Sequence, residues 1–222
     1  MTNIDTLKDL FLDKNLLTLA LTHKSWVNEN PGKRTSNERL EFLGDAILEF
    51  VVSKELYEKF TNKEEGYLTA LRANLVNTQN LSEVAKKLNI GSALFLSKGE
   101  EEGGGRQNSS LLADTVEAII GAIFLDQGLK KVSEFIHTNL LVEIPEKLKE
   151  PLKDPKSRLQ EYVQAKGLST PKYKLIEESG PDHSKKFIME VVIDGESWGR
   201  GVGKSKSIAE QKAAEDGLKK TL

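Results

Sequence analysis

The stretch NERLEFLGDAILEF, residues 37–50, decides the architecture of the first part of the chain. Its apolar residues recur at intervals of three and four, the spacing of one face of an α-helix. Its acids share that spacing and form one stripe: Glu38, Glu41, Asp45 and Glu49. On a wheel that turns about 100° per residue, this stripe lies roughly opposite the expected core-facing positions, which are Leu40, Leu43, Ile47, Phe50 and Val51. We therefore predict one long helix over residues 38–59 with an acidic face.

The simplest interpretation of an acidic stripe is a solvated helix face. Two features of this segment argue against it. No Lys or Arg lies among the acids on this stripe of the helix, although i,i+4 pairs of opposite charge would stabilise an exposed helix. Phe42 lies beside the acids on the wheel and away from the core-facing positions. An aromatic side chain there needs a partner outside its own core, which suggests a subunit interface.

A second segment, LLADTVEAIIGAIFLD, places Asp114 and Glu117 three residues apart on one helix face, with Ala118 and Gly121 beside them. If the two acidic faces meet, their carboxylates repel unless a divalent cation neutralises them. Oxygen ligands suit Mg²⁺ or Mn²⁺, and the chain has neither cysteine nor the paired histidines of a zinc site. The spacing alone leaves open a shared metal site or two unrelated acidic faces.

The overall composition indicates an ordinary globular protein. The 222 residues fit one large or two small domains, and the absence of cysteine excludes a disulfide scaffold. Apolar runs are far shorter than a membrane span, and the first residues lack the layout of a signal peptide. We expect a soluble intracellular protein without a membrane partner.

The first part of the chain, residues 1–148, is predicted to be all-α, because helical periodicity recurs without credible strand pairing. Helices are expected over 38–59, 65–88 and 109–125, and loops over 28–36 and 99–110. Ser36 or Asn37 is expected to cap the helix that follows. A segment rich in proline and charge leads into a linker at 149–153.

The second part, residues 154–222, is predicted to have α+β structure. Alternating apolar and polar residues predict strands over 172–178, 185–193 and 196–203, and Asp194-Gly195 predicts a hairpin turn. Helices over 156–166 and 205–220 complete an α-β-β-β-α order. Residues 151–222 contain 14 Lys and Arg against 11 Asp and Glu, whereas residues 1–150 contain 18 against 23. The basic second part hints at a polyanionic partner.

The two acidic segments, NERLEFLGDAILEF and GEEEGGGRQNSSLLADTVEAIIGAIFLDQG, resemble the conserved blocks of the ribonuclease III family, in the family's order. The resemblance extends over nearly the whole chain. It implies a cytoplasmic homodimer that cleaves double-stranded RNA by Mg²⁺-dependent phosphodiester hydrolysis. The implied products have 5′-phosphate and 3′-hydroxyl ends with short 3′ overhangs, and the implied role is processing of ribosomal and other structured RNA precursors.

The resemblance also assigns roles to residues. Asp45 and Glu117 are implied to be catalytic, and Glu41, Asp114 and Glu117 to bind Mg²⁺, for which Mn²⁺ is a plausible substitute. Glu38 and Glu65 are implied to be accessory acids, and Phe42 to insert into the partner subunit. The small residue Ala46 stands where many members have a hydroxyl residue, and we attach no consequence to it.

The segment GVGKSKSIAEQKAAEDGL and the α-β-β-β-α order are similar to the double-stranded RNA-binding domain. The implied RNA contacts come from the first helix, the first strand loop and the start of the last helix: Gln160, Glu161, Pro181, His183, Lys204, Ser205, Lys206 and Lys212. A helix N-terminus with lysines is also a physically suitable phosphate site. Ser207 departs from the family, which commonly has a second lysine there, so one phosphate contact is expected to weaken or shift.

The remaining polar and aromatic residues carry weaker signals. His23 is expected to be structural, because a metal mechanism needs no imidazole, and Trp26 and Trp198 are expected to pack. Arg106 lies in the glycine-rich stretch, where contact with RNA phosphate and disorder without RNA both stay open. The triple glycine lacks the following Lys-Ser/Thr of a phosphate-binding loop, so no nucleotide cofactor is expected.

Two other classes of function compete with the nuclease. One is a protein that binds duplex RNA without cutting it, and the four acids at 41, 45, 114 and 117 argue against that. The other is a Mg²⁺-dependent hydrolase of small nucleotides, which leaves the second domain unexplained.

Overall fold

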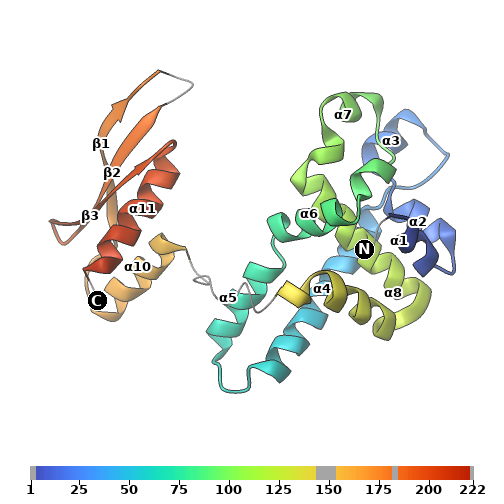
Figure 1. The fold of residues 1–222 in the computed structure, drawn as a ribbon, viewed down its shortest axis with the longest axis horizontal. Helices are drawn as coiled ribbons and strands as arrows, with labels where there is room; N and C mark the ends of the chain where they lie inside the picture. The colour runs from blue at the N-terminus through green and yellow to red at the C-terminus, as the bar shows by residue number, and fades with distance from the viewer. Residues whose placement is uncertain (1–3, 144–153, 182–184, 221–222) are drawn as a thin grey trace. The chain divides into compact units, whose positions relative to one another are not determined.

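The computed structural model describes residues 4–143, 154–181 and 185–220, which fall into two compact units, Met1–Glu150 and Pro151–Leu222. Each unit is considered by itself (Figure 1). The predicted linker at 149–153 lies outside the described residues.

The first unit is built from helices, as predicted. Its α-helices are α1 (Ile4–Leu10), α2 (Lys14–Ala20), α3 (Lys24–Glu29), α4 (Glu38–Lys59), α5 (Glu65–Leu75), α6 (Thr78–Lys87), α7 (Lys98–Glu102) and α8 (Ser109–Asn139). Short 3-10 helices cover Ile90–Ala93, Gly105–Gln107 and Leu141–Glu143. The helix predicted over 109–125 is longer than expected and kinks at Gly128, whose φ of 77° and ψ of −175° are not helical.

Two helices from distant parts of the sequence, α4 and α8, lie against each other in the interior of this unit (Figure 1). Their backbones come unusually close where each carries a glycine. A methyl group on Gly44 would overlap the carbonyl oxygen of Glu117, and one on Gly121 would overlap the carbonyl oxygen of Leu40. This close approach sets the separation of the two acidic segments.

The predicted loop over 99–110 was wrong, because helical structure covers most of it. Helix α7 begins after Ser97, whose hydroxyl accepts a hydrogen bond from the Glu100 amide at 3.1 Å. A 3-10 turn at Gly105–Gln107 and the first residues of α8 follow. Local polarity and glycine content suggested a loop, but capping and tertiary contacts determine the conformation.

The start of α4 also differs from the prediction. Asn37 occupies the cap position but makes no side-chain cap bond. Its side-chain amide Nδ2 instead donates to the Ala20 carbonyl at 3.0 Å. The Ser36 hydroxyl donates to the Glu38 carboxylate at 2.8 Å. Asn37 therefore fastens α4 to α2 rather than capping it.

The second unit has the predicted order: α10 (Pro155–Ala165), β1 (Lys172–Ser179), β2 (Lys186–Ile193), β3 (Glu196–Gly203) and α11 (Lys206–Lys219). The three strands form an antiparallel sheet in the order β1-β2-β3. Positive φ at Asp194 and Gly195 confirms the predicted tight turn between β2 and β3. The core lies between the two helices and one face of the sheet, where Leu159, Val191 and Ala213 are fully buried.

Among the described residues, no helix combines the length and the apolar character needed to cross a bilayer.

Candidate metal centre and nucleic-acid interface

The acids of α4 border its buried face, which corrects the predicted wheel. The residues that α4 buries are Leu40, Gly44, Leu48, Val51, Val52 and Leu56. Phe50, assigned to the core by the wheel, is 52% exposed, and Glu41 is half-buried. The wheel gave no weight to Gly44, which has no apolar side chain, yet this residue marks the face that touches α8. Glu41 therefore points toward the acids of α8 instead of away from them.

Helix α8 presents its acids to the same place. Asp114 and Glu117 lie one turn apart, and the small residues Ala118 and Gly121 beside them are fully buried, as expected of a close helix contact. These small residues admit another helix, and that helix is α4, whose backbone at Leu40 approaches Gly121.

The carboxylates of the two helices meet in one cluster. Glu41, Asp114 and Glu117 each offer an oxygen atom that lies within 4.8 Å of the other two. We call these three residues the carboxylate cluster. The two acidic faces predicted from the sequence are therefore one site, and the alternative of two unrelated faces is wrong.

The pKa values of the clustered carboxyls are raised, because these groups are partly buried and close to one another. Burial raises the pKa of Glu117 to about 7, helped by the negative charges of Asp45, Asp114, Glu41 and Glu49. Burial also raises the pKa of Glu41 and of Asp114, and Asp114 adds to the effect on Glu41. Close carboxylates in a desolvated place hold protons or a cation. A hard dication such as Mg²⁺ or Mn²⁺ suits this all-oxygen donor set.

Asp45 and Glu38 flank the cluster without joining it. Asp45 is exposed and close enough to raise the pKa of Glu117. Glu38 accepts a hydrogen bond from Ser36, and its carboxylate lies 3.4 Å from the ammonium of Lys24 on α3. Sequence reasoning missed Lys24, because the search for paired charges covered only residues on the same helix. The feature of the sequence that could have indicated Lys24 is its position next to His23, in the segment that precedes α4.

His23 has a structural contact, as predicted. It is the cap of α3, and its Nδ1 accepts a hydrogen bond from the Ser25 amide at 3.3 Å. Burial lowers its pKa, which favours the neutral ring that such acceptance requires.

Glu65 and Phe42 are not members of the carboxylate cluster. Glu65, in the first turn of α5, accepts a hydrogen bond from Thr69 at 2.8 Å and lines a pocket of about 580 Å³ between α4 and α5. Phe42 is 81% exposed, as its wheel position predicted. Phe50 and Tyr57 at the pocket are also exposed aromatics, so α4 carries an unusual amount of uncovered aromatic surface.

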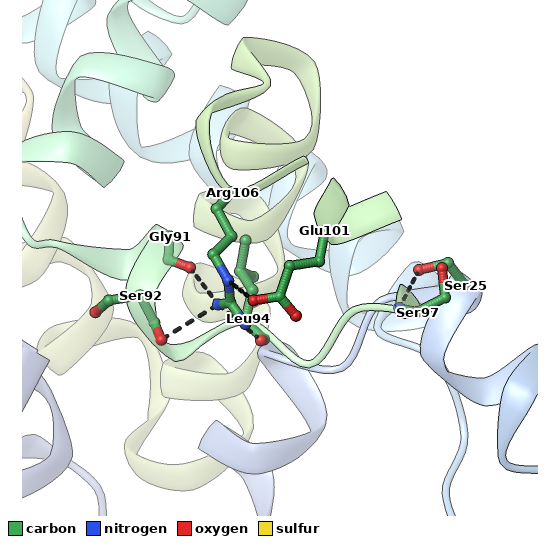
Figure 2. A network of polar contacts seen from close by, with 7 residues as sticks. All are labelled: Ser25, Gly91, Ser92, Leu94, Ser97, Glu101 and Arg106. Carbon is green, nitrogen blue, oxygen red and sulfur yellow. Dashed lines mark hydrogen bonds and ion pairs between the residues drawn. The ribbon is translucent and has the colours of Figure 1, made fainter. Parts of the chain in front are cut away.

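Arg106 is held by contacts within its own unit (Figure 2). Its Nε donates to Glu101 at 2.7 Å, and its Nη1 donates to the carbonyl oxygens of Gly91, Ser92 and Leu94 at 2.8, 3.3 and 3.2 Å. These contacts join α7 to the Ile90–Ala93 turn. The structure thus gives Arg106 an organising role, and its predicted contact with RNA stays a prediction.

The predicted RNA contacts of the second unit lie on its surface. Gln160 and Glu161 are exposed on α10, and Pro181 is exposed after β1, whereas His183 lies outside the described residues. The Ser205 hydroxyl caps α11 by accepting from the Ile208 amide at 3.3 Å. The three predicted lysines of this end are all exposed: Lys204, Lys206 and Lys212.

The two tryptophans pack against aromatic neighbours, in agreement with the prediction. Trp26 meets Phe95 edge-on at 6.0 Å between ring centroids, and the Arg34 guanidinium lies 4.9 Å from the Trp26 ring. Trp198 on β3 packs against the core of the second unit and against Tyr162.

Comparison with known proteins gives matches over both units. A family described as Ribonuclease-III-like matches residues 13–144, and the double-stranded RNA binding motif matches residues 155–221. The "Ribonuclease 3" of Bacillus cereus (strain G9842) is 46% identical over 211 residues, which cover 95% of this chain and 86% of that protein. The "Ribonuclease 3" of Streptococcus pneumoniae (strain P1031) is 43% identical, covering 96% and 92%.

Solved structures give a parallel result for the first unit. The nuclease domain of ribonuclease III from Campylobacter jejuni is 45% identical and has a TM-score of 0.56, covering 62% of this chain and 98% of that one. That structure is described as flexible in a region involved in dimer formation.

Proposed function

The chain belongs to the ribonuclease III family, and from this premise we propose that it is an endoribonuclease that cleaves double-stranded RNA with the help of Mg²⁺. The observation that carries the proposal is the carboxylate cluster at the contact of α4 and α8. A nuclease needs a place where a phosphodiester can be attacked, and this cluster is the chemically reactive feature of the first unit.

The residues of the cluster fit a hard dication. Glu41, Asp114 and Glu117 supply only carboxylate oxygens, which Mg²⁺ and Mn²⁺ prefer, and burial together with the neighbouring carboxylates raises the pKa of Glu117, an effect that a bound cation would offset. Bound there, Mg²⁺ would supply an acidified water and positive charge for the phosphate oxygens.

The other contributions come from the chain itself. Glu117 is the most desolvated acid of the cluster, so its carboxylate would gain most from a bound cation. Asp45 is exposed beside Glu117, where it can accept a hydrogen bond from an attacking water. Glu38 and Glu65 act from outside the cluster as accessory acids.

The second unit supplies affinity for the duplex. Duplex RNA offers phosphates and 2′-hydroxyls rather than base edges, and exposed lysines at the start of a helix suit phosphates. Lys204, Lys206 and Lys212 of this unit are therefore assigned to the RNA backbone, with Gln160 and Glu161 contacting a minor groove. His183 and Pro181 would contact the next minor groove, and Arg106 a phosphate near the first unit.

The active form is a homodimer. The nearly bare Phe42 ring and the uncovered aromatics around the pocket on α4 and α5 form an apolar surface that a second copy would cover. Two-fold symmetry would present one carboxylate cluster to each strand of a duplex. Attack of water on phosphorus with the ribose 3′ oxygen as leaving group would give 5′-phosphate and 3′-hydroxyl ends, and a stagger between the two cuts would leave the short 3′ overhangs.

The cellular role rests on family membership alone. We assign the chain to the cytoplasm and to the processing of ribosomal and other structured RNA precursors, including messenger RNA. The domain limits that we propose are residues 1–148 for the nuclease and 154–222 for the RNA-binding domain.

The proposal is tested by incubating a long RNA duplex with the protein in Mg²⁺, in Ca²⁺, and in Mg²⁺ with the Glu117→Gln variant. Cutting is expected only for the unaltered protein in Mg²⁺, with duplex binding kept in all three cases. A Glu134→Gln variant is the matched control, because Glu134 is an acid of α8 paired with Lys131 instead of the cluster. Normal cleavage by Glu117→Gln would rule out the assigned site.

A further inference from the structure

Lys24 is a cation beside the carboxylate cluster to which the proposed mechanism gives no role. Its ammonium lies 3.4 Å from the Glu38 carboxylate, and the two side chains are 62% and 54% exposed. An exposed ion pair of this kind adds little to the stability of a fold. Stability therefore does not account for a lysine at this position.

The backbone that carries Lys24 is tied firmly to the start of α4. The backbone N–H of Asn37 donates to the Thr22 carbonyl at 2.9 Å, and its side-chain amide donates to the Ala20 carbonyl. Asn37 itself is only 3% exposed. On the other side, the His23 amide donates to the Phe95 carbonyl at 3.1 Å. The lysine therefore extends from a fixed base, and only its flexible side chain is free to change partner.

The charge of Lys24 reaches the cluster itself. Glu38, whose carboxylate lies 3.4 Å from the Lys24 ammonium, precedes Glu41 by three residues on α4, so the two carboxylates share one helix face about one turn apart. Lys24 thus lies on the side of the cluster where α3 meets the first turn of α4, and its partner Glu38 is one helical turn from Glu41.

A polyanionic substrate meets an unfavourable field at such a place. One dication at the cluster does not offset all of its carboxylates, and the phosphates that flank the reacting one face the remaining negative charge. A mobile ammonium at the rim solves this problem, because it can exchange a carboxylate for a phosphate without moving the backbone. Lysine, as a compact charge on a flexible stem, is suited to that exchange.

We propose that Lys24 is a substrate-contacting residue, whose ammonium leaves Glu38 when RNA binds and holds a backbone phosphate next to the carboxylate cluster. The inference rests on the proposed function and adds a residue to it. It also assigns Glu38 a purpose, which is to keep the lysine in place before RNA arrives.

Loss of this charge has two opposite effects. Without the ammonium, the cluster is more negative, so it binds a dication more tightly. Without the ammonium, a phosphate contact is also lost, so RNA is held and cleaved less well. A residue that only supported the fold would weaken both properties together.

The test compares Lys24→Met and Lys24→Arg with a control, Lys131→Met, which removes a similar paired lysine from α8. Circular dichroism confirms the fold of each variant. Duplex binding in Ca²⁺ is measured against salt concentration, and single-turnover cleavage is measured against Mg²⁺ concentration.

For Lys24→Met we expect the salt slope of binding to fall by about one. Cleavage at saturating Mg²⁺ should slow by about tenfold to a hundredfold, the loss of one charged hydrogen bond. The Mg²⁺ concentration that gives half of the maximal cleavage rate should be lower than for the unaltered protein. Lys24→Arg should restore the salt slope, and Lys131→Met should match the unaltered protein.

The inference is overturned if Lys24→Met keeps the salt slope of the unaltered protein, whatever its cleavage rate. It is also overturned if half-saturation shifts to higher Mg²⁺, which would make Lys24 a support of the metal site. A failure of the unaltered protein to cleave would count against the proposed function instead, and the binding measurement in Ca²⁺ would still decide the role of Lys24.

Discussion

Glu117 shows at the scale of one residue why the carboxylate cluster needs a cation. Its carboxyl is desolvated by the contact of α4 and α8 and surrounded by four other acids, and its pKa is raised from 4.5 to about 7. An isolated acid on a helix surface would not behave this way. The same burial that positions the carboxylate also makes its ionisation costly.

This cost makes stability depend on pH in a defined direction. Because the folded pKa of Glu117 lies above the unfolded value, the folded state binds the proton more tightly, and stability falls as pH rises from about 4.5 to about 7. In metal-free buffer at pH 8, Glu117→Gln should therefore unfold at a higher denaturant concentration than the unaltered protein, by about 1–2 kcal/mol after allowance for solvent screening.

Denaturant unfolding at pH 4 and pH 8 checks this expectation. The advantage of Glu117→Gln should disappear at pH 4, where the carboxyl is protonated in both states. Glu134→Gln, on the exposed part of α8, should show no such pH-dependent difference. If the stability difference between Glu117→Gln and the unaltered protein is the same at pH 4 and pH 8, the Glu117 carboxyl is not desolvated.

At the scale of elements, the glycines of α4 and α8 bring the acids together. A side chain at Gly44 would collide with the backbone at Glu117, and no rotamer change relieves a collision with backbone. We expect Gly44→Ala to destabilise the protein by about 1–3 kcal/mol and to weaken Mg²⁺ binding, because α4 and α8 must move apart.

Thermal unfolding with and without Mg²⁺ measures both effects. Gly66→Ala is the matched control, because a methyl group on Gly66 in α5 meets nothing within 4 Å. That variant should be neutral or slightly more stable, since alanine is the better helix former. Equal behaviour of the two variants would contradict the close contact of α4 and α8.

The elements also show what the sequence could and could not predict. Helix 38–59 was predicted with its correct ends, and the β2–β3 turn at Asp194-Gly195 was predicted from its two turn-forming residues. These features depend on neighbours in sequence. Helix α7 was missed, because its conformation depends on the Ser97 cap and on Arg106, which binds carbonyls more than ten residues away.

The acids of the site could be predicted from the sequence, but their position relative to the buried face of α4 could not. Spacing alone put acids on two faces, and resemblance named the members, but neither showed that the acids of α4 lie beside its buried face. That arrangement depends on Gly44, which contributes no side chain to a hydrophobic pattern. Lys24 was missed for a related reason, since it approaches the acids from a different helix.

At the scale of the whole molecule, the account requires a second copy of the chain. Phe42 is 81% exposed on a helix that also carries the acids, so a contact through Phe42 would connect assembly to the site. We expect Phe42→Glu to convert a dimer to a monomer and to lower cleavage at dilute protein concentration, because a buried unpaired charge opposes association.

Light scattering during gel filtration checks the assembly state. Leu12→Glu is the matched control, because Leu12 is 80% exposed but lies before α2, away from α4. It should remain dimeric. A monomeric unaltered protein would contradict the proposed homodimer, and a dimer that survives Phe42→Glu would place the interface elsewhere.

The proposed function depends on side chains of α4 and α8 that hold one dication between them. The most direct measurement is a crystal structure of the protein grown with Mn²⁺, with data collected at the manganese absorption edge. We predict an anomalous peak within bonding distance of oxygen atoms from Glu41, Asp114 and Glu117. A map at saturating Mn²⁺ without a peak among these three carboxylates would contradict the account.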